Sequence, residues 1–200
     1  MSEGAQPGEL LVIFGPPAVG KMTVGRAVCE RTDFRLFLNH DTIEPLVEVF
    51  GFGTPGFDTL NGEFRRRVIE EAARAGIRLI FTLVWDLQGE QDAQWVSGVI
   101  TPYSDAGLRV SFVELVADFH TRLGRNRGED RLLAKPSKRD FEWSDGNLRE
   151  LEQRVVMNTD PSVSMPADDL LAAHRHLRID NHAPAPDAAA EQIVEWLAAN

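Results

Sequence analysis

The sequence predicts an α/β fold in which helices cover both faces of a five-stranded parallel β-sheet, within a single domain of residues 1–200. Short apolar segments alternate with segments of helical periodicity, which requires crossover connections and therefore parallel strands. The apolar segments are continuous rather than alternating, as in strands buried on both faces. A glycine-bounded loop joins the first apolar segment to the first helix, as in a strand–loop–helix unit.

The elements follow one another at regular spacing. Runs rich in Val, Ile, Leu and Phe predict strands at 10–14, 35–38, 77–84, 109–116 and 177–180. Helical periodicity predicts helices at about 21–31, 59–75, 90–106, 118–126, 146–157 and 187–198, and another through Ile43, Leu46 and Val47. Asp41 and Asp187 are the expected N-caps of their helices. Residues 51–56 predict a loop, and the polar, basic stretch 127–145, broken by Pro136, predicts a mobile flap or a helix–loop–helix.

Composition limits the classes of function. The chain has 200 residues, enough for one domain with a sizeable core, and 43% of them are hydrophobic. A net charge of -10 argues against broad affinity for nucleic acid or membrane surfaces. Cys29 is the only cysteine, which excludes a disulfide framework and fits a reducing compartment. With a polar, glycine-rich beginning and no long apolar run, we expect a cytoplasmic protein.

The loop after the first predicted strand is a phosphate-binding P-loop. Its glycines let the backbone turn so that several N–H groups face one concavity, and the following helix adds the positive end of its dipole. Lys21 supplies a mobile charge for the β- and γ-phosphates. Met22 occupies the position directly after the lysine, where the usual pattern has a hydroxyl. The residues expected to hold the nucleotide are Gly15, Pro16, Pro17, Ala18, Val19, Gly20, Lys21, Met22 and Thr23.

Acidic residues follow the predicted strands at the edge where ligands of parallel sheets bind. Asp86 ends the third apolar run and is a candidate Mg²⁺ ligand together with Thr23, although a helix cap or surface acid is the plain alternative. Asp41 follows the second strand and is a candidate for orienting and deprotonating an acceptor hydroxyl. Catalysis and helix capping are both open for Asp41.

Arginines gather after the fourth predicted strand. The segment 122–139 contains seven basic and two acidic residues, so it is locally basic in an acidic protein. Guanidinium groups bind phosphate oxygens through two parallel hydrogen bonds and can stack on a purine. We therefore expect a nucleotide-binding lid over about 122–145, with Arg122, Arg125, Arg127 and Arg131 facing the phosphates or the base. A solvated basic face is the alternative.

Taken together, these motifs resemble the P-loop small-molecule kinases, the shikimate, gluconate and adenylate kinase group, over nearly the whole chain. The run 128–143 resembles a bacterial group known only as kinase-like ATPases. The resemblance implies that Arg122 flanks adenine, that Arg131 reaches the phosphates, and that Asn181 begins the adenine-holding loop. The pair of spaced aspartates that the shikimate family carries after its second strand is replaced by Asn39-His40-Asp41, so the substrate does not carry over.

With this resemblance we expect the three-layer P-loop NTPase fold with strand order 2-3-1-4-5. The expected function is ATP- and Mg²⁺-dependent transfer of the γ-phosphoryl group to a small metabolite, with Lys21, Asp41 and Arg131 as catalytic residues. A nucleoside or nucleotide kinase and a nucleotide-binding switch without an acceptor remain alternatives. We expect a monomer or homodimer whose partner is a small molecule, not a nucleic acid or a membrane.

Overall fold

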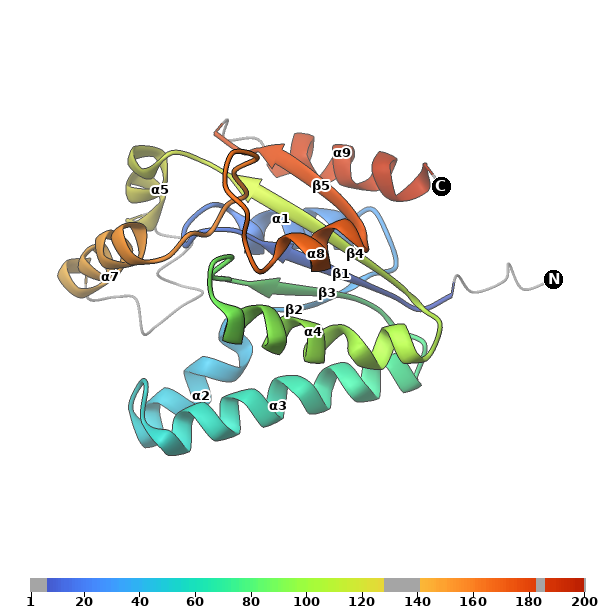
Figure 1. Ribbon diagram of the computed structural model, residues 1–200, viewed down its shortest axis with the longest axis horizontal. Coiled ribbons are helices and arrows are strands. Elements are labelled where there is room, and N and C mark those ends of the chain that lie inside the picture. The colour runs from blue at the N-terminus through green and yellow to red at the C-terminus, as the bar shows by residue number, and fades with distance from the viewer. Residues whose placement is uncertain (1–6, 128–140, 183–185, 200) are drawn as a thin grey trace.

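The computed structural model describes residues 7–127, 141–182 and 186–199. Its five strands form one parallel sheet in the order β2-β3-β1-β4-β5, which confirms the predicted topology (Figure 1). The strands are β1 (Glu9–Phe14), β2 (Arg35–Phe37), β3 (Arg78–Leu83), β4 (Arg109–Val116) and β5 (Arg175–Asp180).

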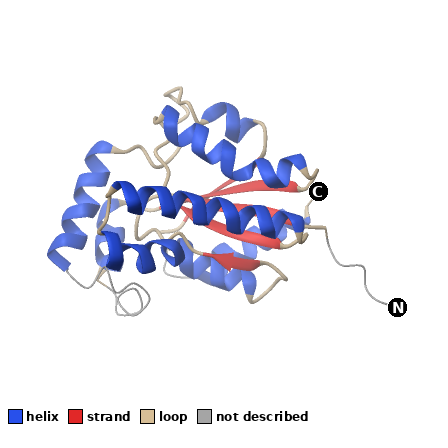
Figure 2. Cartoon of the chain, turned by 90° about the horizontal axis from the view of Figure 1, so that it is seen from below, coloured by secondary structure: helices blue, strands red, loops and turns tan. Residues whose placement is uncertain are grey.

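Helices pack on both faces of the sheet, so that the molecule has three layers (Figure 2). Apolar side chains of α1 and α9 join one buried cluster, and those of α3, α4 and α8 join the other. No helix in the described ranges is long and apolar enough to cross a membrane. The helices are α1 (Lys21–Cys29), α2 (His40–Phe50), α3 (Pro55–Arg74), α4 (Glu90–Asp105), α5 (Phe119–Asn126), α7 (Phe141–Arg154), α8 (Asp168–Ala172) and α9 (Pro186–Ala198).

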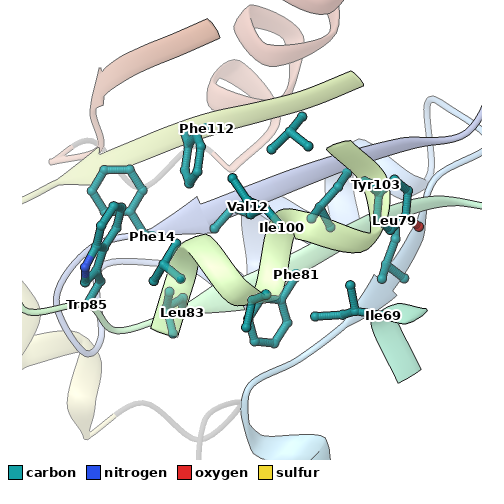
Figure 3. Close-up of a cluster of buried hydrophobic side chains, with 14 of the residues drawn as sticks. Val12, Phe14, Ile69, Leu79, Phe81, Leu83, Trp85, Ile100, Tyr103 and Phe112 are labelled. Atoms are coloured by element: carbon teal, nitrogen blue, oxygen red, sulfur yellow. The ribbon is translucent and has the colours of Figure 1, made fainter. Parts of the chain in front are cut away.

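The central position of β1 in the sheet explains why its sequence is apolar at every position from 10 to 14. Leu10, Val12 and Phe14 point into the cluster under α3 and α4, whereas Leu11 and Ile13 point into the cluster under α1 and α9. All five are at most 1% exposed, and each contributes about 1.5–3 kcal/mol by leaving water. Figure 3 shows Val12 and Phe14 among the aromatic side chains of the first cluster. The strand that carries the P-loop is therefore the most buried strand.

The structure corrects two predicted N-caps and adds one helix. The helix expected to start at Asp41 starts at His40 after Asn39, and the last helix starts at Pro186, so neither Asp41 nor Asp187 caps its helix. Asp187 instead accepts a hydrogen bond of 2.7 Å from Arg31. The five-residue helix α8 has too few turns for a periodic signal, and it was not predicted.

The helix α3 begins earlier than its apolar periodicity indicated. Thr54 accepts a hydrogen bond of 3.4 Å from the N–H of Phe57, and Pro55 occupies the first turn, where a missing N–H costs nothing. The predicted loop is thereby limited to the turn at 51–54 between α2 and α3. The two helices and this turn form the α2–α3 hairpin. It carries five of the six exposed large hydrophobic side chains found in the described residues: Val49, Phe50, Phe52, Leu60 and Phe64.

Candidate functional site

The P-loop leaves the carboxyl end of β1, and both of its bounding glycines are required. Gly15 has φ 137°, and a Cβ there would lie 2.4 Å from the Leu115 carbonyl oxygen of the neighbouring strand. Gly20 has φ 109°, and a Cβ there would lie 2.7 Å from Asn181 Nδ2. Because side chains rarely adopt such φ values and neighbours fill the space, the loop can follow this path only with glycine at these positions.

The loop is closed by the side chain of its lysine. Lys21 is the first residue of α1, and its Nζ donates to the carbonyl oxygens of Gly15 at 2.6 Å and Pro16 at 2.8 Å. Ala18 has φ 63°, a conformation that costs a non-glycine residue about 1–2 kcal/mol. The ammonium group and a strained backbone thus meet at the amino end of a helix, which is the arrangement that binds phosphate.

A second wall of the site contacts the P-loop through the carbonyl oxygen of Val19. Asn181, which is 6% exposed, donates from Nδ2 to this oxygen at 2.7 Å, and Arg125 of α5 donates to it at 3.2 Å. Arg125 also donates to the carbonyl oxygen of His182 at 3.1 Å. The loop after β5 and the helix after β4 are thereby joined to the P-loop.

His182 belongs to this wall and was not singled out from the sequence. Its Nε2 accepts a hydrogen bond of 2.8 Å from the N–H of Asp118 and lies 3.0 Å from Asp118 Oδ2, while its Nδ1 contacts the Asp180 carboxylate. Hydrogen bonds from Thr121 hold the pKa of the Asp118 carboxyl below its usual range, and His182 adds to this. The contact with His182 also lowers the pKa of Asp180. Only its position after the last strand could have pointed to His182.

Two other arginines of the predicted lid, Arg122 and Arg127, pair with carboxylates of α7. Arg122 is 2% exposed, contacts Glu152, and donates to the carbonyl oxygen of Ala117 at 3.1 Å. Arg127 donates to Asp145 at 2.6 Å. Both guanidinium groups thus join α5 to α7, and among the three described lid arginines Arg125 is the one that contacts the P-loop. Arg131 and the centre of the predicted lid, 128–140, lie outside the described residues.

The opposite wall is formed by the carboxyl ends of β2 and β3 and the start of α2. Asp41 is exposed in the first turn of α2, where its Oδ2 accepts a hydrogen bond of 2.8 Å from the N–H of Leu38. Arg65 of α3 is 9% exposed and donates to Thr42 Oγ1 at 3.0 Å and to the carbonyl oxygen of Asn39 at 3.1 Å. Burial lowers the pKa of Arg65 to about 10.

The two residues expected to hold a metal lie on different elements. Thr23 is exposed in the first turn of α1. Asp86 follows β3 by three residues, and its Oδ1 accepts hydrogen bonds from the N–H groups of Gln88 at 3.2 Å and Val156 at 3.3 Å. Within the described part of the chain, no three His, Cys, Asp or Glu side chains gather as a metal cage.

No known protein-family model matches the chain, and no curated protein is a detectable relative. Solved structures are similar over the full length. The sugar kinase from Janibacter sp. HTCC2649 matches at 16% identity with a TM-score of 0.60, covering 96% of this chain and 95% of its own. The Mycobacterium tuberculosis APS kinase, solved in complex with AMPPNP and APS, matches at 14% identity and a TM-score of 0.61, covering 97% and 99%.

Shikimate kinase from Acinetobacter baumannii, in complex with shikimate, matches at 19% identity and a TM-score of 0.57, covering 98% of this chain and 95% of its own. These similarities agree with the strand order β2-β3-β1-β4-β5 and with the P-loop after β1. The chain therefore has the fold of the P-loop small-molecule kinases, which confirms at the level of the fold the resemblance inferred from its sequence.

Proposed function

We propose that this protein is an ATP- and Mg²⁺-dependent kinase that transfers the γ-phosphoryl group to a small metabolite. The observation that carries the proposal is the position of Lys21 Nζ, 2.6 Å and 2.8 Å from two carbonyl oxygens of a loop that ends at a helix N-terminus. Phosphate oxygens are stronger acceptors than carbonyl oxygens, so Lys21 Nζ can donate to the phosphates of a bound nucleotide instead of to these carbonyl oxygens. The neighbours' bound AMPPNP and shikimate support a nucleotide site and an acceptor site on this fold.

Phosphoryl transfer on this scaffold depends on positioning and charge. The loop N–H groups and Lys21 hold the β- and γ-phosphates, and Arg125 and Asn181 keep Val19 and thus the loop in place. A bond forms between the acceptor oxygen and the γ-phosphorus, the bond to the β–γ bridging oxygen breaks, and the acceptor proton passes to Asp41. Mg²⁺, held by Thr23 and Asp86, would neutralise charge on the phosphates. Arg131 remains a predicted phosphate contact.

The first test is nucleotide-dependent stabilisation. Mg²⁺ with ATP should raise the melting temperature, because a ligand that binds only the native state stabilises it by mass action. Lys21→Ala should remove most of that shift, whereas Arg26→Ala, on the exposed side of the same helix α1, should keep it. A Lys21→Ala variant that binds nucleotide like the wild type would place the site elsewhere.

The second test separates a kinase from a nucleotide-binding switch. ADP release is measured with ATP, Mg²⁺ and a panel of hydroxyl-bearing, phosphate-bearing and nucleoside compounds. A kinase should release ADP only with an acceptor, and the class of the active compound distinguishes a metabolite kinase from a nucleoside or nucleotide kinase. ADP release that no compound increases would favour the switch.

A further inference from the structure

Residues 156–159, here called the strap, follow α7 and join the carboxyl-terminal parts of β3 and β4; they belong to the orange chain between α7 and α8 in Figure 1. After β3, the N–H of Leu87 donates to the carbonyl oxygen of Val156 at 2.7 Å. In β4, the side chain of Glu114 accepts a hydrogen bond of 2.8 Å from the N–H of Thr159. Because β1 lies between β3 and β4 in the sheet, the strap is fixed on both sides of the strand that leads into the P-loop.

Within the strap, the side chain of Asn158 is held in one orientation. Its Nδ2 donates to Glu114 Oε1 at 2.9 Å and to the carbonyl oxygen of Leu115 at 3.1 Å. A carboxylate and a carbonyl oxygen can only accept, so the amide must present its NH₂ end to both of them. The two hydrogen bonds fix the amide between the fully buried carboxylate of Glu114 and the backbone of β4.

The carbonyl oxygen that Asn158 holds lies against the first glycine of the P-loop. Gly15 directly follows β1, and β1 is a neighbour of β4 in the sheet. A Cβ on Gly15 would lie 2.4 Å from the carbonyl oxygen of Leu115, so this oxygen occupies the space beside the glycine. The carbonyl oxygen of Gly15 in turn accepts a hydrogen bond of 2.6 Å from Lys21 Nζ. A rotation of the Leu115 peptide group would therefore displace Gly15 and, with it, one of the oxygens that hold the lysine.

The contact with Leu115 distinguishes Asn158 from the other partners of Glu114. The hydroxyl of Thr159 donates to Glu114 Oε2 at 2.7 Å, and His176 Nε2 lies 3.2 Å from the same oxygen. The buried carboxylate thus keeps hydrogen-bond donors when the amide is removed. What the fold gains from an asparagine in the strap is a second hydrogen bond from the same nitrogen, which extends the network from the carboxylate to the strand backbone beside the P-loop.

We propose that Asn158 is a positioning residue of the phosphate site: it holds the Leu115 carbonyl oxygen against Gly15 and so fixes the backbone from which the P-loop and Lys21 bind the nucleotide phosphates. This inference rests on the proposed kinase function and deepens it. Asn158 acts through the backbone of β4 and not through the ligand. Because binding of phosphate by preorganised donors depends on their positions, loss of the hydrogen bond to Leu115 should weaken nucleotide binding.

The first measurement is made on the intact protein without nucleotide. The backbone ¹H–¹⁵N signal of Gly15 reports on the peptide group beside the Leu115 carbonyl oxygen. Asn158→Ala should shift this signal, because it removes the hydrogen bond that holds the oxygen. Thr159→Val is the matched control, since it removes the hydroxyl's hydrogen bond to Glu114 and keeps the N–H of the same residue. It should leave the Gly15 signal in place.

The second measurement is the affinity for AMPPNP with Mg²⁺, taken by calorimetry well below the melting temperature of each variant. Asn158→Ala should raise Kd about threefold to tenfold, the range expected for one lost hydrogen bond. Thr159→Val should leave Kd nearly unchanged even where it lowers the melting temperature as much. Asn158→Leu keeps the branched shape without an N–H donor, and it should raise Kd in the same way, which covers the case that Asn158→Ala does not fold. With an active acceptor, Asn158→Ala should raise KM for ATP and leave KM for the acceptor unchanged.

Two results would overturn the proposal. One is a Gly15 signal that stays in place in Asn158→Ala. The other is a Kd for AMPPNP that Asn158→Ala leaves unchanged or raises no more than Thr159→Val does, as expected if the strap only stabilises the fold. The kinase proposal itself fails on the nucleotide-dependent melting shift of the wild type and its loss in Lys21→Ala. Because the Gly15 signal is measured without nucleotide, the two failures are distinguishable.

Discussion

Gly20 has two independent reasons to be glycine. Its φ of 109° is unfavourable for any side chain, and a Cβ added at this position would lie 2.7 Å from Asn181 Nδ2. That amide also donates to the carbonyl oxygen of Val19, so a displaced Asn181 would release the loop on its other side. Backbone conformation and long-range packing therefore both require glycine at this position.

Gly20→Ala should therefore lower the free energy of unfolding by about 1–2 kcal/mol from backbone conformation alone, and it should weaken nucleotide binding. Gly98→Ala is the matched control, because Gly98 lies inside α4 with no atom within 4 Å of an added Cβ. In a helix interior this change should stabilise by about 0.5–1 kcal/mol. Urea unfolding measures both changes in the free energy of unfolding. Equal changes at the two positions would contradict the requirement for glycine at position 20.

Asp41→Asn tests the acid–base role that we propose for this residue. Asparagine can keep the hydrogen bond from the Leu38 N–H, now 2.8 Å, but it cannot take a proton. Turnover should fall on the order of 10²-fold, while ATP affinity should barely change. Asp58→Asn, in the first turn of α3, should leave both quantities intact. A variant with nearly full turnover would limit Asp41 to its contact with the backbone.

The position of the P-loop after β1 could be predicted because its sequence signal is local. Gly15, Gly20 and Lys21 lie within one loop, and the loop's chemistry is readable from spacing. The contact of Arg125 with Val19 joins residues 106 positions apart, and only the fold determines it. For the same reason the sequence could not distinguish Arg125 from Arg122, which is buried against Glu152.

Among the elements, α5 shows how a helix is fixed at the site. Asp118 precedes its first residue and accepts hydrogen bonds from the Thr121 N–H at 2.7 Å and the Thr121 hydroxyl at 2.9 Å. The same residue contacts His182, whose carbonyl oxygen holds Arg125. The start of α5 and the loop after β5 are thus fixed by one carboxylate.

Asp118→Ala should lower the stability through loss of the N-cap and should also weaken nucleotide binding through Arg125. Asp118→Ser can keep the cap, because a serine hydroxyl accepts the same N–H, and should restore most of the stability. Chemical unfolding and nucleotide titration of the two variants check this, and equal stability of Asp118→Ala and the wild type would exclude the cap.

Helices and strands were predicted well where periodicity is long, and poorly at their ends. The strand β4 was expected at 109–116 and spans Arg109–Val116, because eight continuous positions, nearly all of them buried, leave little choice. The start of α3 at Pro55 depends instead on the hydroxyl of Thr54 and on proline, which carry no apolar signal. Helix boundaries follow capping chemistry more closely than they follow hydrophobic pattern.

Across the whole molecule, one buried acid joins the sheet to the segment that covers it. Glu114 in β4 is 0% exposed and accepts hydrogen bonds from Thr159 N–H at 2.8 Å and Asn158 Nδ2 at 2.9 Å. His176 and Arg178 of β5 contact the same carboxylate. Burial by itself would raise the pKa of Glu114, but hydrogen bonds from His176, Thr159 and Asn158 lower it below its usual value.

Stability should therefore depend on pH through Glu114. Because its pKa is lower in the folded state, the unfolded chain binds a proton first as pH falls, and stability is lost below about pH 4.5. Glu114→Gln should lower stability at pH 7 by about 2–3 kcal/mol and reduce the slope of stability against pH in that acidic range. Unfolding free energies from about pH 3 to 7 measure this, with Glu150→Gln, an exposed residue paired with Arg154, as control. Parallel pH curves for Glu114→Gln and the wild type would contradict it.

The unequal burial of β1 and of the α2–α3 hairpin has a consequence for how this protein can evolve. The P-loop is attached to a strand whose amides should exchange hydrogen only through global unfolding, whereas a hairpin with Phe52 63% exposed can open locally. Sequence changes at the exposed hairpin positions Val49, Phe52 and Phe64 therefore carry little risk for the fold, while changes near Gly15 carry much. We therefore expect related chains to differ more in this hairpin than at the P-loop.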